Sequence, residues 1–216
     1  MNICVSGMIG VGKTTLIDNL ALELNIGKVV ETPLGFKYLS RLFTEPERWG
    51  FEAQVAFLIG KANGILAKED MGQPYLVDRS IEEDAKIFYE YFREKHSIDS
   101  LTNSTYQELY KLLCCKIPRP TIQIICTIDK ETVLNRIETR DKFNSYVEGY
   151  VESIFDRYNQ YIEKLRGKTN TFMCDALKYD WTKNDTVNII AADVHKLING
   201  LDGSPNLDLS ILREHK

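Results

Sequence analysis

The nine residues GMIGVGKTT, Gly7–Thr15, restrict the fold of this 216-residue chain more than any other stretch. They contain the pattern Gly-x-x-x-x-Gly-Lys-Thr, which follows the apolar run NICVS at 2–6 and leads into the helical pattern TTLIDNLALEL. Glycines let successive backbone N–H groups turn toward a single anion, and the first turn of the following helix adds a partial positive charge. Strand, loop and helix in this order predict a P-loop that holds the phosphates of a nucleotide.

The residues of this loop have different expected roles. Lys13 is expected to reach the β- and γ-phosphates, and the hydroxyl of Thr14 is expected to bind Mg²⁺. Contacts to the nucleotide are expected along the whole loop, from Gly7, Met8, Ile9, Gly10, Val11, Gly12, Lys13, Thr14 and Thr15.

A P-loop needs an acidic partner near the metal, usually where a neighbouring strand ends. Asp78 follows YLV and precedes Arg79, at the carboxyl end of a strand, where open α/β sheets bind their ligands. Asp129 follows IICTI, but KET and a helical stretch come next, which favours a helix N-cap there. We therefore predict Asp78 as the second magnesium ligand.

Short apolar runs rich in β-branched residues alternate with longer amphipathic segments, which is typical of βαβ units and a parallel sheet. We expect strands at 2–6, 28–31, 75–78, 121–128 and 171–176. We expect helices at about 13–25, 51–69, 80–95, 102–116, 130–139, 147–166 and 185–199. The predicted fold class is α/β, a three-layer fold with a five-stranded parallel sheet flanked by helices. We expect one domain over 1–216, with no function assigned to the tail at 201–216.

The composition of the chain argues against nucleic acid and membranes as binding partners. The formal net charge of −4 lacks the basic excess of a protein that coats nucleic acid or anionic membranes. No stretch approaches the roughly 18 apolar residues of a membrane span. The five cysteines show no Cys-x-x-Cys spacing, and three of them lie in expected strands, which indicates buried free thiols in a reducing compartment. We therefore expect a cytoplasmic protein that binds neither nucleic acid nor membrane.

P-loops serve kinases, GTPases, motors and transporters. The guanine-reading pattern [NT]-K-x-D does occur as TKND at 182–185, but it does not end a strand, and the switch pattern D-x-x-G is absent from the sequence. Motors and transporters need further domains or coupling motifs that the chain does not show. A small kinase remains the favoured prediction, with a nucleotide-binding regulatory module as the alternative from another class.

A kinase that acts on a hydroxyl needs a carboxylate near the γ-phosphate to take the proton. Glu31 ends an expected strand on the same edge of the sheet as the P-loop, and Pro33, two residues later, is expected to fix the loop that follows. The transferred group also needs cations from a segment that closes over it. Arg136 and Arg140 lie one turn apart in NRIETRDKF and are expected on one helix face, beside a lid at about 138–147.

Taken in order, GMIGVGKTT, ETPLGF, EPERWGFEAQ, DRSIEEDA and NRIETR resemble the deoxyribonucleoside kinase family over residues 1 to about 165. That family includes deoxycytidine, deoxyguanosine and bacterial deoxyadenosine kinases. The resemblance implies a P-loop kinase fold, ATP as donor, Glu31 as general base, and Arg79 near both that base and the 5'-oxygen. It also implies a homodimer through helices like those at 51–69 and 80–95.

The acceptor site follows from the same resemblance. Gln54 corresponds to the glutamine that binds the nucleobase, and EPERWGFEAQ adds Trp49 to the expected substrate contacts. Lys61 and Asp84 occupy the base-selecting positions of members that take cytosine or purines, which argues against thymidine. Phe43 stands where the family has a tyrosine for the sugar 3'-hydroxyl, and Glu148 is a displaced substitute for the lid glutamate.

We therefore predict an ATP- and Mg²⁺-dependent deoxynucleoside kinase that phosphorylates the 5'-hydroxyl of a purine deoxynucleoside or deoxycytidine. The departures at Phe43 and in the lid leave a nucleoside monophosphate kinase of the same fold as the enzymatic alternative. Lys37, Arg41 and Arg48 are the nearby candidates for the second phosphate that such an enzyme would bind.

Overall fold

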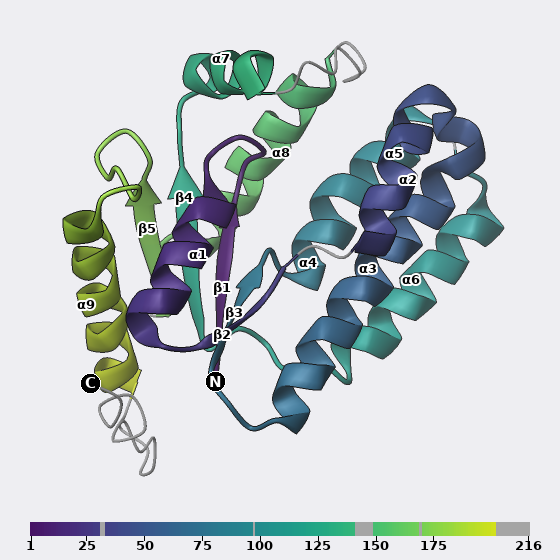
Figure 1. The fold of residues 1–216 in the computed structure, drawn as a ribbon. Coiled ribbons are helices and arrows are strands. Elements are labelled where there is room, and N and C mark those ends of the chain that lie inside the picture. The colour runs from purple at the N-terminus through teal and green to yellow at the C-terminus, as the bar shows by residue number, and fades with distance from the viewer. Residues whose placement is uncertain (31–32, 97, 141–148, 169, 202–216) are drawn as a thin grey trace.

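A computed structural model describes residues 1–30, 33–96, 98–140, 149–168 and 170–201 (Figure 1). Five strands form one sheet in which every pair is parallel, in the order β2-β3-β1-β4-β5. The bounds of the strands are β1 Asn2–Gly7, β2 Gly27–Val29, β3 Tyr75–Asp78, β4 Ile122–Thr127 and β5 Thr171–Asp175. All five expected strands are confirmed, and so is the three-layer α/β fold.

Helices cover both faces of the sheet because its strands are apolar on both sides. On one face, Leu76 of β3 and Ile124 of β4 pack against α1 (Lys13–Leu24) and α9 (Asn184–Leu201). On the other face, Ile125 packs against α7 (Lys130–Arg140) and α8 (Tyr150–Leu165). Neighbouring residues thus enter different cores, as the period of two in a strand requires.

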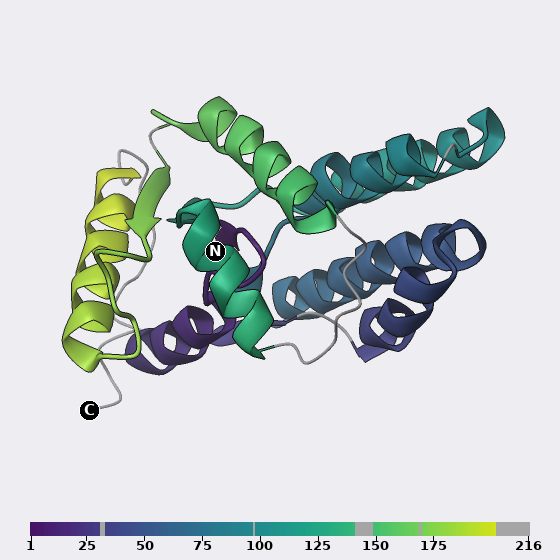
Figure 2. The same cartoon turned by 90° about the horizontal axis from the view of Figure 1, so that it is seen from above.

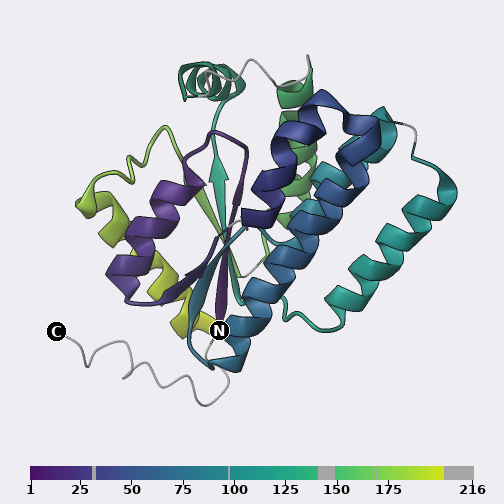
Figure 3. The ribbon, with the colours of Figure 1, turned by 45° about the vertical axis from the view of Figure 1, so that its right-hand side comes forward.

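Three further helices extend the second face beyond β2. Figure 3 shows α2 (Pro33–Thr44), α3 (Pro46–Asp70) and α6 (Ser100–Cys114) lying side by side there. Val29 and Val77 pack into the core that α3 and α6 form with the segment after β3. Of these helices, α2 and α3 line one side of a cleft at the carboxyl edge of the sheet. Among the described helices, none is long and apolar enough to cross a membrane.

The helix predictions needed three corrections. Residues 33–44 form α2, although the sequence predicted a loop fixed by Pro33, because proline at the first helical position favours a helix start. Helix α3 begins at Pro46 for the same reason, five residues before the expected 51. The single helix expected at 80–95 is divided into α4 (Ile81–Glu83), the π-helix η1 (Asp84–Tyr89) and α5 (Glu90–Lys95).

The π-helix changes which side chains share a face. A π-helix closes i→i+5 hydrogen bonds and so turns less per residue than an α-helix, and such turns are frequent at functional sites. Asp84 begins η1, and both Asp84 and Phe88 line the cleft.

The interpretation of Asp129 as an N-cap is confirmed, since its Oδ1 accepts a hydrogen bond of 2.8 Å from the backbone N–H of Thr132.

Candidate active site

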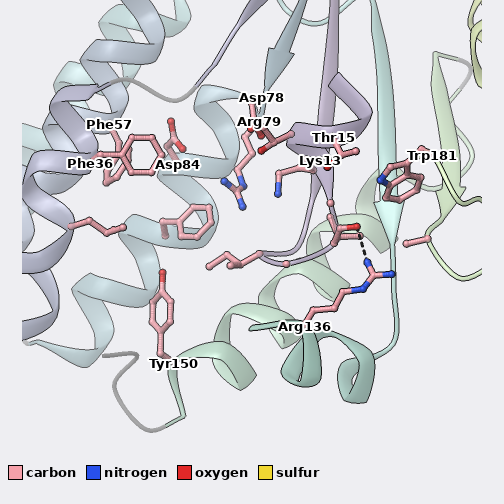
Figure 4. Close-up of a pocket in the computed structure, with 18 of the residues that line it drawn as sticks. Lys13, Thr15, Phe36, Phe57, Asp78, Arg79, Asp84, Arg136, Tyr150 and Trp181 are labelled. Atoms are coloured by element: carbon pink, nitrogen blue, oxygen red, sulfur yellow. Dashed lines mark hydrogen bonds between the residues drawn. The ribbon is translucent and has the colours of Figure 1, made fainter. Parts of the chain in front are cut away.

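A cleft of about 1070 Å³ opens at the carboxyl ends of β1 and β3 (Figure 4). The P-loop and Arg136 line it on one side, and α2, α3 and η1 line it on the other. The segment 176–182 after β5 and Tyr150 at the start of α8 complete the lining. Figure 2 shows α7 crossing above this edge of the sheet. The topology therefore gathers at one place side chains that lie far apart in the sequence.

The glycines of the P-loop are required by its backbone. Gly7 has φ 147°, and a Cβ there would lie 2.6 Å from the carbonyl oxygen of Cys126. Gly12 has φ 100°, and a Cβ there would lie 2.9 Å from Nε1 of Trp181. Between them, the side chains of Met8 and Val11 are buried in the cores on opposite faces of the sheet. The loop is therefore anchored by its apolar residues while its backbone is exposed toward the cleft.

Two cations are tied to the P-loop. Lys13 is 6% exposed, and its Nζ donates to the carbonyl oxygen of Met8 at 3.1 Å. Figure 4 shows the ammonium group of Lys13 pointing into the cleft. Arg136 of α7 donates from Nη1 to the carbonyl oxygen of Val11 at 3.1 Å, which links the predicted lid helix to the loop. Thr14 and Thr15 line the cleft beside them.

The end of β3 places a carboxylate, Asp78, and a guanidinium, Arg79, beside the cleft. Asp78 is 6% exposed, and among the described residues its Oδ1 is buried without a hydrogen-bond partner. Arg79 has a left-handed backbone with φ 62°, and its N–H donates to the carbonyl oxygen of Val5 at 3.0 Å. The Arg79 guanidinium carbon lies 5.1 Å from the centre of the Phe88 ring. Strain of this kind outside glycine persists where surrounding contacts hold the residue in place.

The other end of the cleft is a pocket of aromatic rings around buried polar groups. Lys61 of α3 donates from Nζ to Oδ1 of Asp84 at 2.9 Å, with side-chain exposures of 4% and 7%. Gln54, two turns earlier on the inner side of α3, is also buried and lines the cleft. Lys61 itself is not among the lining residues, so it acts on the cleft through Asp84. Phe57 and Phe88 also line this end.

Two aromatic positions differ in their relation to the cleft. Phe43 lines it and meets the ring of Tyr150 edge to face, with 5.5 Å between ring centres. Figure 4 shows the hydroxyl of Tyr150 directed into the cleft. Trp49 is not part of the lining, because its ring lies under the guanidinium groups of Arg41 at 4.7 Å and Arg48 at 4.2 Å.

Some predicted site residues lie outside the part of the chain that the structure describes. Glu31 and Glu148 are outside it, and so are most of the predicted lid at 138–147 and the tail beyond 201. Of Arg140, only the helical backbone is described. Their predicted roles stay predictions.

Sequence reasoning missed several lining residues. Phe88 lies four residues after Asp84, a spacing that shares a face, but a phenylalanine in IFYEYF reads equally well as core. Trp181 stands alone in the polar segment KYDWTKND, and its carbonyl oxygen accepts a hydrogen bond of 2.9 Å from Asn19 of α1. Its ring lies beside Gly12 of the P-loop. A tryptophan in a polar loop after the last strand was the available signal.

The buried cysteines of the sheet are not candidate nucleophiles. Cys4, Cys126 and Cys174 are buried free thiols, as predicted. Burial raises the pKa of Cys126 well above its ordinary value and raises that of Cys174 to about 12. Because a thiol must lose its proton to attack, these side chains stay unreactive near neutral pH.

The family model of deoxynucleoside kinases matches residues 3–199 of the chain. The chain belongs to the deoxynucleoside kinase family. It is 31% identical over 190 residues to the deoxyadenosine/deoxycytidine kinase of Bacillus subtilis (strain 168), covering 86% of this chain and 85% of that relative. It is 28% identical over 170 residues to the deoxyguanosine kinase of the same organism, covering 76% of this chain and 79% of that relative.

The fold comparison agrees with the family. The deoxyadenosine kinase from M. mycoides with bound dATP superposes with a TM-score of 0.74, over 90% of this chain and 100% of that chain, at 19% identity. The deoxynucleoside kinase is therefore a phosphotransferase with an alcohol group as acceptor, built on a P-loop kinase fold.

Proposed function

We propose that this deoxynucleoside kinase transfers the γ-phosphoryl group of ATP to the 5'-hydroxyl of a purine deoxynucleoside or deoxycytidine. The observation that carries the proposal is the buried ion pair of Lys61 and Asp84. Figure 4 shows Asp84 at the end of the cleft away from the P-loop. It supplies a fixed polar group in a pocket that Gln54, Phe57 and Phe88 also line. A nucleobase that enters must match that group or leave it unpaired.

The carboxylate of Asp84 favours a base that carries an amino group. A carboxylate only accepts hydrogen bonds, and Lys61 holds one of its oxygens at 2.9 Å. Adenine, guanine and cytosine each carry an exocyclic amino group, and thymine carries none. A buried polar group left unpaired by a ligand costs binding free energy, so thymidine is disfavoured. Relatives named as deoxyadenosine/deoxycytidine, deoxyadenosine and deoxyguanosine kinases support this choice.

The P-loop side of the cleft is the proposed ATP site. In this proposal the backbone of 7–15 cradles the phosphates, and Lys13, whose Nζ donates to the carbonyl oxygen of Met8, binds the β- and γ-phosphates. Arg136 and the neighbouring Arg140 stabilise the negative charge of the group in transfer. Cations fixed in advance are effective because they need no reorganisation during the reaction.

The residues present fit Mg²⁺. Asp78 presents a buried carboxylate oxygen without a partner among the described residues, and Thr14 presents a hydroxyl on the adjoining loop. No group of three or more His, Cys, Asp or Glu side chains in the described ranges could hold a metal unaided. This suits an ion that is usually bound by one or two carboxylates together with substrate phosphates. When bound there, Mg²⁺ neutralises phosphate charge.

The proposed chemistry on the acceptor belongs to Glu31 and Arg79. Glu31 takes the proton of the 5'-hydroxyl, and the guanidinium of Arg79, which points into the cleft, orients that carboxylate and the 5'-oxygen (Figure 4). Phe43 lines the sugar site, where it has no hydroxyl to offer. Tyr150, edge-on to Phe43 at 5.5 Å, and Glu148 are the proposed polar contacts of the sugar.

The placement of three cations disfavours a nucleoside monophosphate kinase. Lys37, Arg41 and Arg48 are exposed, and none lines the cleft. Arg41 and Arg48 lie over the ring of Trp49, and Arg48 also pairs with Glu52 at 2.7 Å. A second phosphate-binding cluster within the cleft is therefore missing from the described residues.

A substrate panel tests the proposal. The purified enzyme is assayed with ATP and Mg²⁺ against deoxyadenosine, deoxyguanosine, deoxycytidine and thymidine, and against their monophosphates. We expect turnover of at least one of the first three nucleosides, with thymidine and all monophosphates far behind. Preferred turnover of a monophosphate or of thymidine would refute the assignment.

We also propose that the enzyme works in the cytoplasm as a homodimer. Most side chains of 80–95 are buried between α3 and α8, so this segment offers little surface for a second subunit. Helix α6, beside α3, exposes Leu101 and Leu112 and is the better candidate for the contact. Light scattering after size-exclusion chromatography should give twice the mass of one chain.

A further inference from the structure

Behind Arg79, away from the cleft, lies a fully buried set of hydrogen bonds. Nε of Arg79 donates to the hydroxyl of Tyr158 at 2.9 Å. The hydroxyl of Tyr158 donates to Oε2 of Glu83, also at 2.9 Å. Tyr158 is 1% exposed and Glu83 is 0% exposed, and neither lines the cleft.

The direction of these hydrogen bonds is determined by their chemistry. The Nε–H of arginine can only donate, so the oxygen of Tyr158 must accept it. The single hydrogen of that hydroxyl is then directed to Glu83. Burial raises the pKa of Tyr158 well above its ordinary value, which keeps that hydrogen in place. The three groups therefore have one arrangement of hydrogens.

Glu83 is itself fixed from several sides. Its Oε1 accepts from Ser6 Oγ at 2.7 Å and from the backbone N–H of Ser80 at 2.9 Å. Ser6 precedes the first glycine of the P-loop, and Gln123 of β4 donates to Ser6 Oγ at 3.0 Å. The carboxylate thus joins the strand of the P-loop, the turn after β3 and helix α8.

The two sides of the Arg79 guanidinium are constrained differently. Its Nε edge is bound by Tyr158, and the Phe88 ring lies 5.1 Å from the guanidinium carbon. A guanidinium is a rigid planar fork, so fixing Nε sets the direction of the two terminal nitrogens, which face the cleft. Through Tyr158 and Glu83, the orientation of the Arg79 guanidinium is fixed relative to β1, the strand that leads into the P-loop.

The geometry points to Tyr158, held by Glu83, as a positioning residue that sets the guanidinium of Arg79 relative to the P-loop. The inference rests on the proposed function, in which Arg79 orients the base and the 5'-oxygen. Tyr158 touches neither substrate and acts only through Arg79. Loss of its hydroxyl should therefore lower turnover while leaving the binding of ATP in place.

Tyr158→Phe tests this, with Tyr161→Phe as the matched control. Tyr161 lies on the same helix, is 7% exposed, and its hydroxyl accepts from Gln123 at 3.3 Å without contacting Arg79. We expect kcat of Tyr158→Phe to fall by about 10- to 100-fold with the best nucleoside, since small misplacements cost that much. The KM for ATP should stay within about threefold, and Tyr161→Phe should keep nearly full kcat.

A double-variant comparison separates positioning from a general structural role. In an Arg79→Gln background, Tyr158→Phe should lower kcat no further than Tyr161→Phe does, because its effect passes through Arg79. Equal losses of kcat from Tyr158→Phe and Tyr161→Phe in the wild-type background would overturn the inference. So would an undiminished kcat of Tyr158→Phe.

A readout without turnover keeps the inference distinct from the proposed function. In protein labelled with ¹⁵N-arginine, the Nε–H of Arg79, assigned by its loss in Arg79→Gln, should exchange slowly with water in the wild type and in Tyr161→Phe. It should exchange fast in Tyr158→Phe. Fast exchange in the wild type would overturn the inference, even if Tyr158→Phe did not fold. Failure of the wild type to phosphorylate any deoxynucleoside would refute only the proposed function.

Discussion

Replacement of Lys61 by methionine should separate the stability of the enzyme from its choice of nucleobase. Lys61 and Asp84 form an ion pair of 2.9 Å with side-chain exposures of 4% and 7%. Removing one partner of a buried ion pair costs about 3–5 kcal/mol, mostly because the other charge stays buried. For a chain of this size, about 2–4 °C of Tm is lost per kcal/mol, so Lys61→Met should lower Tm by roughly 6–20 °C.

The double variant Lys61→Met, Asp84→Leu removes both charges of the pair and is compared with Lys61→Met. Apolar side chains of similar volume often replace a buried ion pair without net loss of stability, so most of the lost Tm should return. The group that selects the base is then gone. Because a hydrogen bond to a charged group contributes about 1.5–3 kcal/mol, preference for the best nucleoside over thymidine should fall by about 10- to 150-fold.

Scanning calorimetry and kcat/KM for the four deoxynucleosides measure the two effects separately. A loss of less than about 1 kcal/mol in Lys61→Met would show that the pair is not buried as the structure has it. A double variant that recovers its Tm and still rejects thymidine as strongly as the wild type would refute the argument that Asp84 selects the base.

Four other perturbations have definite expected outcomes. Glu31→Gln should lower kcat by about 10²- to 10⁴-fold, because it removes the proton acceptor. The Kd for ATP, measured by equilibrium binding, should stay nearly unchanged, because nothing else is removed. Unaltered turnover would end the assignment of Glu31 as the general base. Gly12→Ala should weaken ATP binding, because at φ 100° the added Cβ would lie 2.9 Å from Nε1 of Trp181. The control Gly72→Ala, at φ 65° with open space around it, should leave the Kd for ATP unchanged. Equal Kd values for both variants would contradict the clash at Gly12. Iodoacetamide at pH 8, read by mass spectrometry, should modify only the exposed Cys114 and Cys115 in the folded enzyme. The pKa of Cys174 rises from 9.0 to about 12 on folding, so the unfolded chain releases this proton first and the free energy of unfolding should fall as pH rises through that window; a free energy that does not fall there would contradict the shift.

The sheet and the P-loop could be predicted because their signals are local. Short apolar runs rich in β-branched residues placed all five strands, and the spacing of glycines and Lys13 identified the phosphate cradle before any fold was known. The position of Asp78 in the cleft, at the end of β3, could be predicted from the rule that parallel sheets bind ligands at their carboxyl edge. Helices starting at Pro33 and Pro46 were missed because proline marks both loops and the first turns of helices.

The sequence by itself determined the fold class, the nucleotide loop and the kinase family of this protein, because each depends on residues close together in the chain. Only the tertiary structure showed which side chains support Arg79, since Tyr158 lies 79 residues from Arg79 and 75 from Glu83. It also showed that a π-helix carries Asp84 to the cleft and that Trp49 lies outside the lining. Contacts between distant segments leave no periodic pattern in a single sequence, because packing and not spacing brings those residues together.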